Sequence, residues 1–302
     1  MSVPEATVAA EALVFDTEFL RKLERIEIVA RKIFRGQLRG EHTTMRRGRG
    51  LELADFRSYQ PGDDLRYVDW NIFSRLDRLF LKLYVSEEDV TLNLLVDASA
   101  SMRFGTPSKF DQARRMAAAI AYVGLCNLDR VSVSVFADGL GLGMPGLRTK
   151  HAMTKILRFL ESIEARDATN LTAAGRAFAA RARHPGLVMV ITDLLDWDDA
   201  RPGLEALVHR GNEVVVVQLL AEEEIAPPLD GPLRLRDSET GEELRVTVDA
   251  ELRHLYRRRL DAHLARIEAF CREHAVEYLR ASTAIPFEDV VLRYLRRGMH
   301  VR

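Results

Sequence analysis

The sequence predicts an α/β protein built on a doubly wound, mostly parallel sheet. Three observations lead to this fold class. From Val90 onward, strand-length apolar runs alternate with helical patterns, which is typical of a parallel sheet covered by helices on both faces. Two of these runs end in an acidic residue, Asp97 and Asp193. The chain has 302 residues, 47% of them hydrophobic, which is enough for one large domain or two moderate ones with a substantial core.

The N-terminal part is expected to be a flexible tail (residues 1–15) followed by a helix and a β-rich segment (residues 16–89). Between Asp16 and Arg35, apolar residues follow helical spacing with charges between them, which predicts an amphipathic helix packed against its own domain. Residues 39–49 are rich in Gly and Arg and lack aromatic residues, so a solvated loop is favoured over a nucleic-acid site. Alternating apolar residues from Leu79 to Val85 predict a strand.

Residues 90–302 are expected to form the main domain, with a hairpin insertion near residues 230–248. The first strand is residues 92–96, and Thr106-Pro107 supplies a hydroxyl cap and a first-turn proline for the next helix. The sequence Glu239-Thr240-Gly241-Glu242 marks the hairpin turn. Length and periodicity predict further strands at 131–136, 139–143, 187–192, 214–220 and 276–279, and further helices at 153–163, 171–182, 200–209, 252–270 and 286–296.

Composition excludes several classes of partner and location. The net charge of −1 gives no reason to expect nucleic acid or an acidic membrane. The first residues lack the basic stretch of a signal peptide, and no apolar run approaches the ~18 residues of a membrane helix, so we expect no membrane insertion. Cys126 and Cys271 lie within helical patterns, as buried reduced thiols do. We therefore expect a cytoplasmic protein.

The candidate site begins where the first strand of the main domain ends. Asp97 is followed by Ser99 and Ser101, and this spacing lets three oxygen-bearing side chains surround one point. Carboxylate and hydroxyl oxygens suit Mg²⁺, with Mn²⁺ or Ca²⁺ as alternatives. If the two acid-ended strands are neighbours where the strand order reverses, then Thr169, in the loop before a helix, and Asp193 reach the same crevice.

These residues resemble the metal-ion-dependent adhesion site of the von Willebrand factor A family. That site is Asp-x-Ser-x-Ser with a distal Thr and a distal Asp, and it matches Asp97, Ser99, Ser101, Thr169 and Asp193. The resemblance implies a von Willebrand A-like, Rossmann-type fold. It also implies that the hydroxyls bind the metal directly and that the acids bind it either directly or through a water molecule. A partner's acidic side chain then takes the sixth coordination position of the metal.

The preceding block resembles a bacterial and archaeal family of unknown function whose genes commonly accompany MoxR-type AAA+ ATPases. This resemblance implies a non-catalytic, chaperone-like adaptor that binds the ATPase, a client protein, or both through an acidic side chain. It covers about residues 46–102 and rests on Arg49-Gly50, Phe56-Arg57-x-Tyr59, Gly62-Asp63-Asp64-x-Arg66, Asp69-Trp70, Leu81-Lys82 and Glu87-Glu88.

Two other functions stay open: a metal-dependent hydrolase that uses the same site, and a structural module whose site is empty. The chain has no Gly-x-Ser-x-Gly elbow, no Gly-rich loop ending in Lys-Ser/Thr and no zinc pairing among its histidines, so we expect no enzyme with those motifs. Asp63, Asp64 and Asp69 are expected to pair with nearby arginines, Arg57, Arg66 and Arg75. Four further acids are expected to lie at the surface or to cap helices: Asp167, Asp196, Asp198 and Asp199.

Overall fold

The computed structural model describes residues 14–37, 52–60, 63–85, 91–127, 129–182, 184–237 and 241–297. The chain divides into two compact units, Met1–Ile33 with Val90–Arg302, and Phe34–Asp89. Residues 1–13 of the expected tail and the Gly- and Arg-rich segment 39–49 lie outside the described residues.

The larger unit is organised around a mostly parallel sheet. Its described strands number six, in the order β10-β7-β6-β3-β4-β5, and β5 is antiparallel to β4 whereas the other neighbours are parallel. The central strands are mostly apolar because both faces of the sheet are covered. The strands are β3 (Thr91–Asp97), β4 (Arg130–Phe136), β5 (Leu140–Leu147), β6 (Leu187–Thr192), β7 (Glu213–Leu220) and β10 (Glu277–Ser282).

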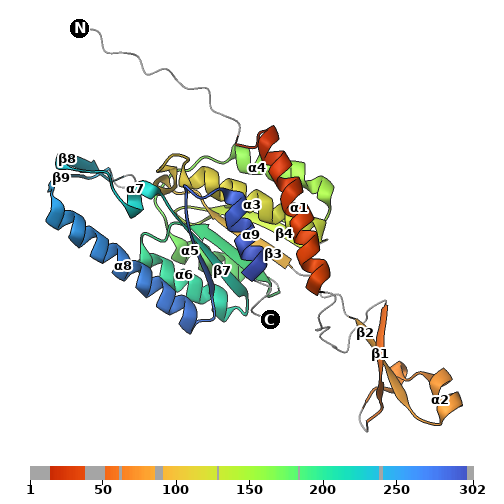
Figure 1. The fold of residues 1–302 in the computed structure, drawn as a ribbon. Coiled ribbons are helices and arrows are strands. Elements are labelled where there is room, and N and C mark those ends of the chain that lie inside the picture. Colours follow the sequence, from red (N-terminus) through yellow and green to blue (C-terminus); the bar gives the residue numbers. More distant parts are fainter. Residues whose placement is uncertain are drawn as a thin grey trace. The chain divides into compact units, whose positions relative to one another are not determined.

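Helices pack on both faces of this sheet (Figure 1). The mostly parallel α/β architecture expected from the sequence is confirmed. One face carries α1 (Thr17–Gln37), α3 (Lys109–Cys126), α4 (Met153–Ser162) and α9 (Phe287–Arg297); the other carries α5 (Leu171–Arg181), α6 (Trp197–His209) and α8 (Ala250–Glu273). Strands β8 (Gly231–Arg236) and β9 (Glu243–Val248) pair antiparallel within the range expected for the hairpin.

Several helices begin one to three residues away from the starts that the sequence patterns indicated, and the starts of α3 and α6 have clear physical reasons. The expected start of α3 at Thr106-Pro107 is wrong, because both residues lie in a turn and the Ser108 hydroxyl accepts the amide of Asp111 at 3.0 Å. Helix α6 begins three residues earlier than expected. Asp196 caps it by accepting the amide of Asp199 at 3.1 Å, which confirms the capping role expected for this acid.

The N-terminal helix α1 belongs to the larger unit up to Ile33, whereas the sequence pattern predicted a segment that joins it to residues up to 89. Its apolar stripe explains the difference. The buried Phe19 ring lies 5.1 Å from the ring of Phe287 in α9. Farther along α1, the Tyr122 hydroxyl of α3 donates to Glu27 at 2.5 Å. The helix therefore completes the cover over this face of the main sheet.

The smaller unit is an antiparallel pair, β1 (Glu52–Ser58) and β2 (Phe80–Val85), with α2 (Trp70–Leu76) between them in sequence. Two of its expected ion pairs are confirmed: Arg57 lies 2.7 Å from Asp63, and Arg66 lies 2.6 Å from Asp64. The third acid, Asp69, accepts the amides of Asn71 and Ile72 and so caps α2. These acids are therefore engaged in local structure.

Candidate functional site

The candidate site lies where the strand order of the main sheet reverses. From β3 the chain first builds β4 and β5 on one side, and then crosses to build β6 on the other side of β3. Since β3 and β6 are parallel neighbours, their carboxyl ends meet at one edge of the sheet, where α/β proteins bind ligands. Asp97 ends β3 and Asp193 directly follows β6, so the two acid-ended strands are neighbours as expected.

Asp97 is held from both strand ends. It is fully buried, its Oδ1 accepts the amide of Ser99 at 2.9 Å, and its Oδ2 accepts the hydroxyl of Thr192 at 2.5 Å. Thr192 was not among the expected site residues. A hydroxyl directly before the second acid, at the end of a buried strand, is the sequence feature that could have identified it.

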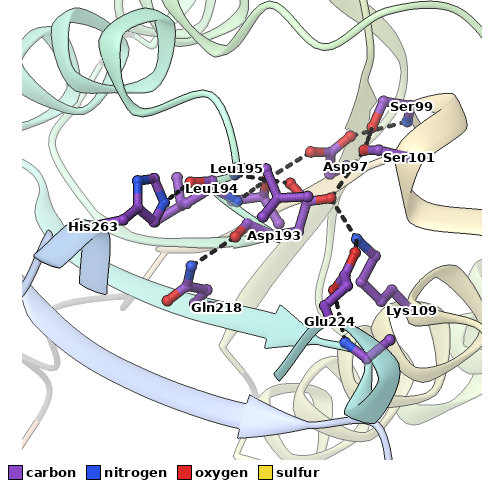
Figure 2. Close-up of polar contacts among 12 residues, drawn as sticks. Asp97, Ser99, Ser101, Lys109, Asp193, Leu194, Leu195, Gln218, Glu224 and His263 are labelled. Atoms are coloured by element: carbon purple, nitrogen blue, oxygen red, sulfur yellow. Dashed lines mark hydrogen bonds and ion pairs between the residues drawn. The ribbon is translucent and has the colours of Figure 1, made fainter. Parts of the chain in front are cut away.

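Three of the expected ligands, Ser99, Ser101 and Asp193, are linked through their side-chain oxygens (Figure 2). The hydroxyl oxygens of Ser99 and Ser101 lie 3.1 Å apart. Ser101 also donates to Oδ2 of Asp193 at 2.9 Å. The structure thus brings Asp97, Ser99, Ser101 and Asp193 into one hydrogen-bonded group, although Ser101 and Asp193 are 92 residues apart in sequence.

The loop that carries Thr169 is bound to the loop that carries the two serines. The amide of Arg166 donates to the carbonyl of Ala98 at 2.8 Å, and the amide of Ala100 donates to the carbonyl of Asp167 at 2.9 Å. Beyond Thr169, the carboxylate of Asp199 accepts the first amide of α5 at 2.7 Å. Thr169 itself is half-buried between these fixed points. Three separate loops therefore meet at this edge of the sheet.

A buried ion pair, not expected from the sequence, adjoins the oxygen cluster. Lys109, the first residue of α3, has no exposed surface, and its ammonium lies 2.7 Å from Oδ2 of Asp193 and 2.6 Å from Oε1 of Glu224. Glu224 belongs to the short helix α7 (Glu222–Ile225), and its other oxygen accepts the amide of Ala221 at 2.8 Å. No spacing signal links these residues, because Lys109 and Glu224 are 115 positions apart.

Burial shifts the protonation of this network. Burial first, and then the charge of Asp193, raise the pKa of Asp97 to about 7 against the hydrogen bonds from Thr192 and Ser99, which lower it. Burial also raises the pKa of Glu224, whereas Lys109 opposes that rise. Burial lowers the pKa of Lys109, but the charges of Asp193 and Glu224 outweigh it and the net shift is upward. With all four groups ionised, three carboxylates and one ammonium sum to −2.

The donor set fits a hard divalent cation. Neighbouring oxygens around an octahedral Mg²⁺ lie about 3.0 Å apart, because each bond is about 2.1 Å long. The two oxygen–oxygen separations in the cluster are 3.1 and 2.9 Å, and a charge of +2 would neutralise the network. Within the described ranges, no group of three or more His, Cys, Asp or Glu residues could hold a metal, so a cation at this edge would need the serine hydroxyls as ligands.

The turn after Asp193 is strained and firmly held. Leu194 has a φ of 53°, which is rare for a residue other than glycine. The side-chain amide of Gln218 donates to the carbonyl of Asp193 at 2.7 Å, and a ring nitrogen of His263 lies 2.9 Å from the carbonyl of Leu194. The next residue, Leu195, is 44% exposed. The fold therefore fixes the second acid while presenting an apolar side chain beside it.

A family model covers most of this chain. The model of the family described as "Protein of unknown function DUF58" matches residues 55–266. Two uncharacterized proteins, Mb1516 of Mycobacterium bovis and Rv1480 of Mycobacterium tuberculosis, are each 27% identical to this chain over 292 residues. The matched region covers 94% of this chain and 92% of each relative.

Solved structures show a weaker likeness. The conserved hypothetical protein BatB from Bacteroides thetaiotaomicron has a TM-score of 0.44 and 16% identity, over 70% of this chain and 100% of that one. An aerotolerance-related membrane protein from Bacteroides fragilis has a TM-score of 0.44 and 17% identity over the same shares. In the part of the chain that the structure describes, no helix combines the length and apolar character needed to cross a membrane.

Proposed function

We propose that this chain, which belongs to the DUF58 family, is a non-catalytic adaptor. It binds a partner protein through a divalent cation. The observation that carries the proposal is the meeting of three loops at the strand-order reversal, where the Ser101 hydroxyl lies 3.1 Å from the Ser99 hydroxyl and 2.9 Å from Oδ2 of Asp193, as neighbouring ligands of one ion do. The match to the von Willebrand A adhesion site supports the same conclusion. Asp97 and Thr169 complete the proposed ligand set.

Each side chain of the set has a defined task. The hydroxyls of Ser99, Ser101 and Thr169 supply neutral oxygen ligands, and Asp97 and Asp193 supply the charge that a divalent cation needs. When bound, Mg²⁺ supplies a positive docking point for a partner's Asp or Glu, and its charge offsets the desolvation of that carboxylate. Thr192 keeps the Asp97 carboxylate turned toward the cluster through its hydrogen bond.

The surroundings of the site support a protein as the ligand. Phe104, three residues after Ser101, is 50% exposed, and Leu195, two residues after Asp193, is 44% exposed. Exposed apolar side chains beside a charged centre are typical of protein-binding surfaces, which combine an apolar core with polar contacts. The proposed partner is a MoxR-type AAA+ ATPase, or the client protein that it remodels, and it contributes the acidic side chain.

A pull-down with the purified chain and the MoxR-type ATPase of the same organism tests the proposal. Wild type with Mg²⁺ should retain the ATPase, whereas chelator or Asp97→Ala should remove the retention. Asp129→Asn is the control, because Asp129 precedes β4 at the opposite, amino-terminal edge of the sheet. If Asp97→Ala and chelated wild type retain as much ATPase as untreated wild type, the proposed mode of binding is wrong.

The buried lysine favours a second candidate, a structural module. Since Lys109 already neutralises one charge of Asp193, the loops can be joined by this ion pair without any cation. In that case Mg²⁺ leaves the stability of the chain unchanged, and Asp97→Ala alters stability without a change in any cation response.

A further inference from the structure

We infer that Lys109 is an internal cation that competes with the divalent cation for Asp193, and that Glu224 holds the lysine when Asp193 turns to the ion. This inference rests on the proposed function and goes beyond it, because it assigns the regulation of cation affinity to two residues outside the ligand set. Lys109 belongs to α3 and Glu224 to α7, whereas the proposed ligands lie in neither helix.

The lysine occupies the carboxylate oxygen that a cation at this site would bind. Oδ2 of Asp193 already accepts the Ser101 hydroxyl at 2.9 Å and the Lys109 ammonium at 2.7 Å. Its other oxygen, Oδ1, accepts the amide of Leu195 at 3.2 Å. The oxygen that faces the serine cluster is therefore the oxygen that the lysine occupies (Figure 2). A cation that binds this oxygen must displace the ammonium or share the oxygen with it.

Glu224 gives the displaced ammonium a second acceptor. It lies 2.6 Å from the lysine nitrogen, and α7 fixes it through the bond from the Ala221 amide to its other oxygen. The hydroxyl of Tyr256 in α8 donates to the backbone carbonyl of Glu224, which also fixes the position of this residue. Since Lys109 has no exposed surface, its charge cannot move to water. The lysine therefore stays charged between the two acids in either state.

Two substitutions with opposite expected effects test this inference. Lys109→Met removes the competing charge while retaining an unbranched apolar side chain, and should tighten Mg²⁺ binding about tenfold or more. Glu224→Gln leaves the lysine with Asp193 as its charged partner, and should weaken Mg²⁺ binding about tenfold. Isothermal titration calorimetry with Mg²⁺ alone measures both. A merely structural role for Lys109 predicts weaker binding after its removal, so a gain in affinity separates the two explanations.

The double variant tests whether Glu224 acts through the lysine. If it does, Lys109→Met with Glu224→Gln should bind Mg²⁺ much as Lys109→Met alone does, because the second change has no charge left to position. Lys150→Met is the control. Lys150 lies 2.8 Å from Glu27 and contacts the ring of Tyr122. Tyr122 is thirteen residues from Lys109 along α3, which corresponds to about 20 Å along the helix axis. The affinity of Lys150→Met should equal that of wild type.

The outcomes are distinct. A wild type that binds Mg²⁺ while Lys109→Met binds it equally or more weakly overturns the inference and leaves the proposed function standing. Tighter binding by Glu224→Gln overturns it too, and this variant keeps the test valid if Lys109→Met fails to fold. A wild type that binds no divalent cation overturns both the inference and the proposed function.

Discussion

At the scale of single residues, burial determines how charges behave in this protein. Asp97, Lys109 and Asp193 are almost completely buried and are all engaged by charged or polar partners. The sequence predicted the clustering of Asp97, Ser99, Ser101 and Asp193, because spacing along one turn and two acid-ended strands contains that information. It could not predict Lys109 and Glu224, because an ion pair between α3 and α7 depends on tertiary packing.

Asp129 provides a pH-dependent prediction outside the candidate site. Burial raises its pKa to about 6, above the ordinary value of 3.8. A raised carboxyl pKa favours folding at low pH, and this contribution is lost as the pH rises from about 4 through 6. Relative to wild type, Asp129→Asn should therefore gain stability between pH 4 and pH 7, by an amount on the order of 1 kcal/mol after allowance for partial exposure.

Urea unfolding of both proteins at a series of pH values measures this difference. The same substitution at the exposed Asp261 of α8 serves as the control. A difference between Asp129→Asn and wild type that stays constant from pH 4 to pH 7 would show that Asp129 keeps its ordinary pKa.

At the scale of elements, close packing of α5 against α6 positions the Thr169 loop. A Cβ on Gly203 would lie 2.2 Å from the carbonyl oxygen of Leu171, and one on Gly175 would lie 2.5 Å from the carbonyl oxygen of Gly203. The sequence predicted both helices from their periodicity. It could not predict this glycine contact, because periodicity gives the buried face of a helix but not the distance to its neighbour. It also missed α2 and α7, which are too short for a periodic signal.

Gly203→Ala should therefore destabilise the chain by about 2–3 kcal/mol, because the added methyl group meets backbone atoms that cannot move independently. The helix start at Leu171 should shift, and Mg²⁺ binding should weaken with it. Gly139→Ala is the matched control, since its Cβ would meet nothing within 4 Å. Equal stabilities of the two variants in urea unfolding would contradict this description of the α5–α6 contact.

At the scale of the whole molecule, the large unit is a sheet covered by helices on both faces, and its candidate site lies at the edge where the carboxyl ends of β3 and β6 meet. The alternation of strands and helices predicted this architecture, and the order of β3, β4 and β6 explains why the acids meet at one place. The division of the chain was harder to predict. The apolar stripe of α1 shows that the helix must pack, but nothing in that stripe identifies α9 and α3 as its neighbours.

Partner binding should depend on the apolar side chains beside the site as well as on the cation. Phe104→Ser and Leu195→Ser should each reduce retention of the MoxR-type ATPase severalfold while leaving Mg²⁺ affinity unchanged, because neither side chain is a proposed ligand. Leu142→Ser is the control, since Leu142 is 70% exposed on the edge strand β5. If all three variants reduce retention equally, the exposed residues beside the site have no special part in docking.

The most direct test is the stability of the wild-type chain as Mg²⁺ is added, compared with Asp97→Ala under the same conditions. At about 100 times its dissociation constant, a cation bound to the folded state adds ~2.7 kcal/mol of stability. We expect the melting temperature of wild type to rise with Mg²⁺ and that of Asp97→Ala to stay constant. A wild type whose melting temperature does not respond to Mg²⁺, Mn²⁺ or Ca²⁺ would contradict the account of a cation site at this edge of the sheet.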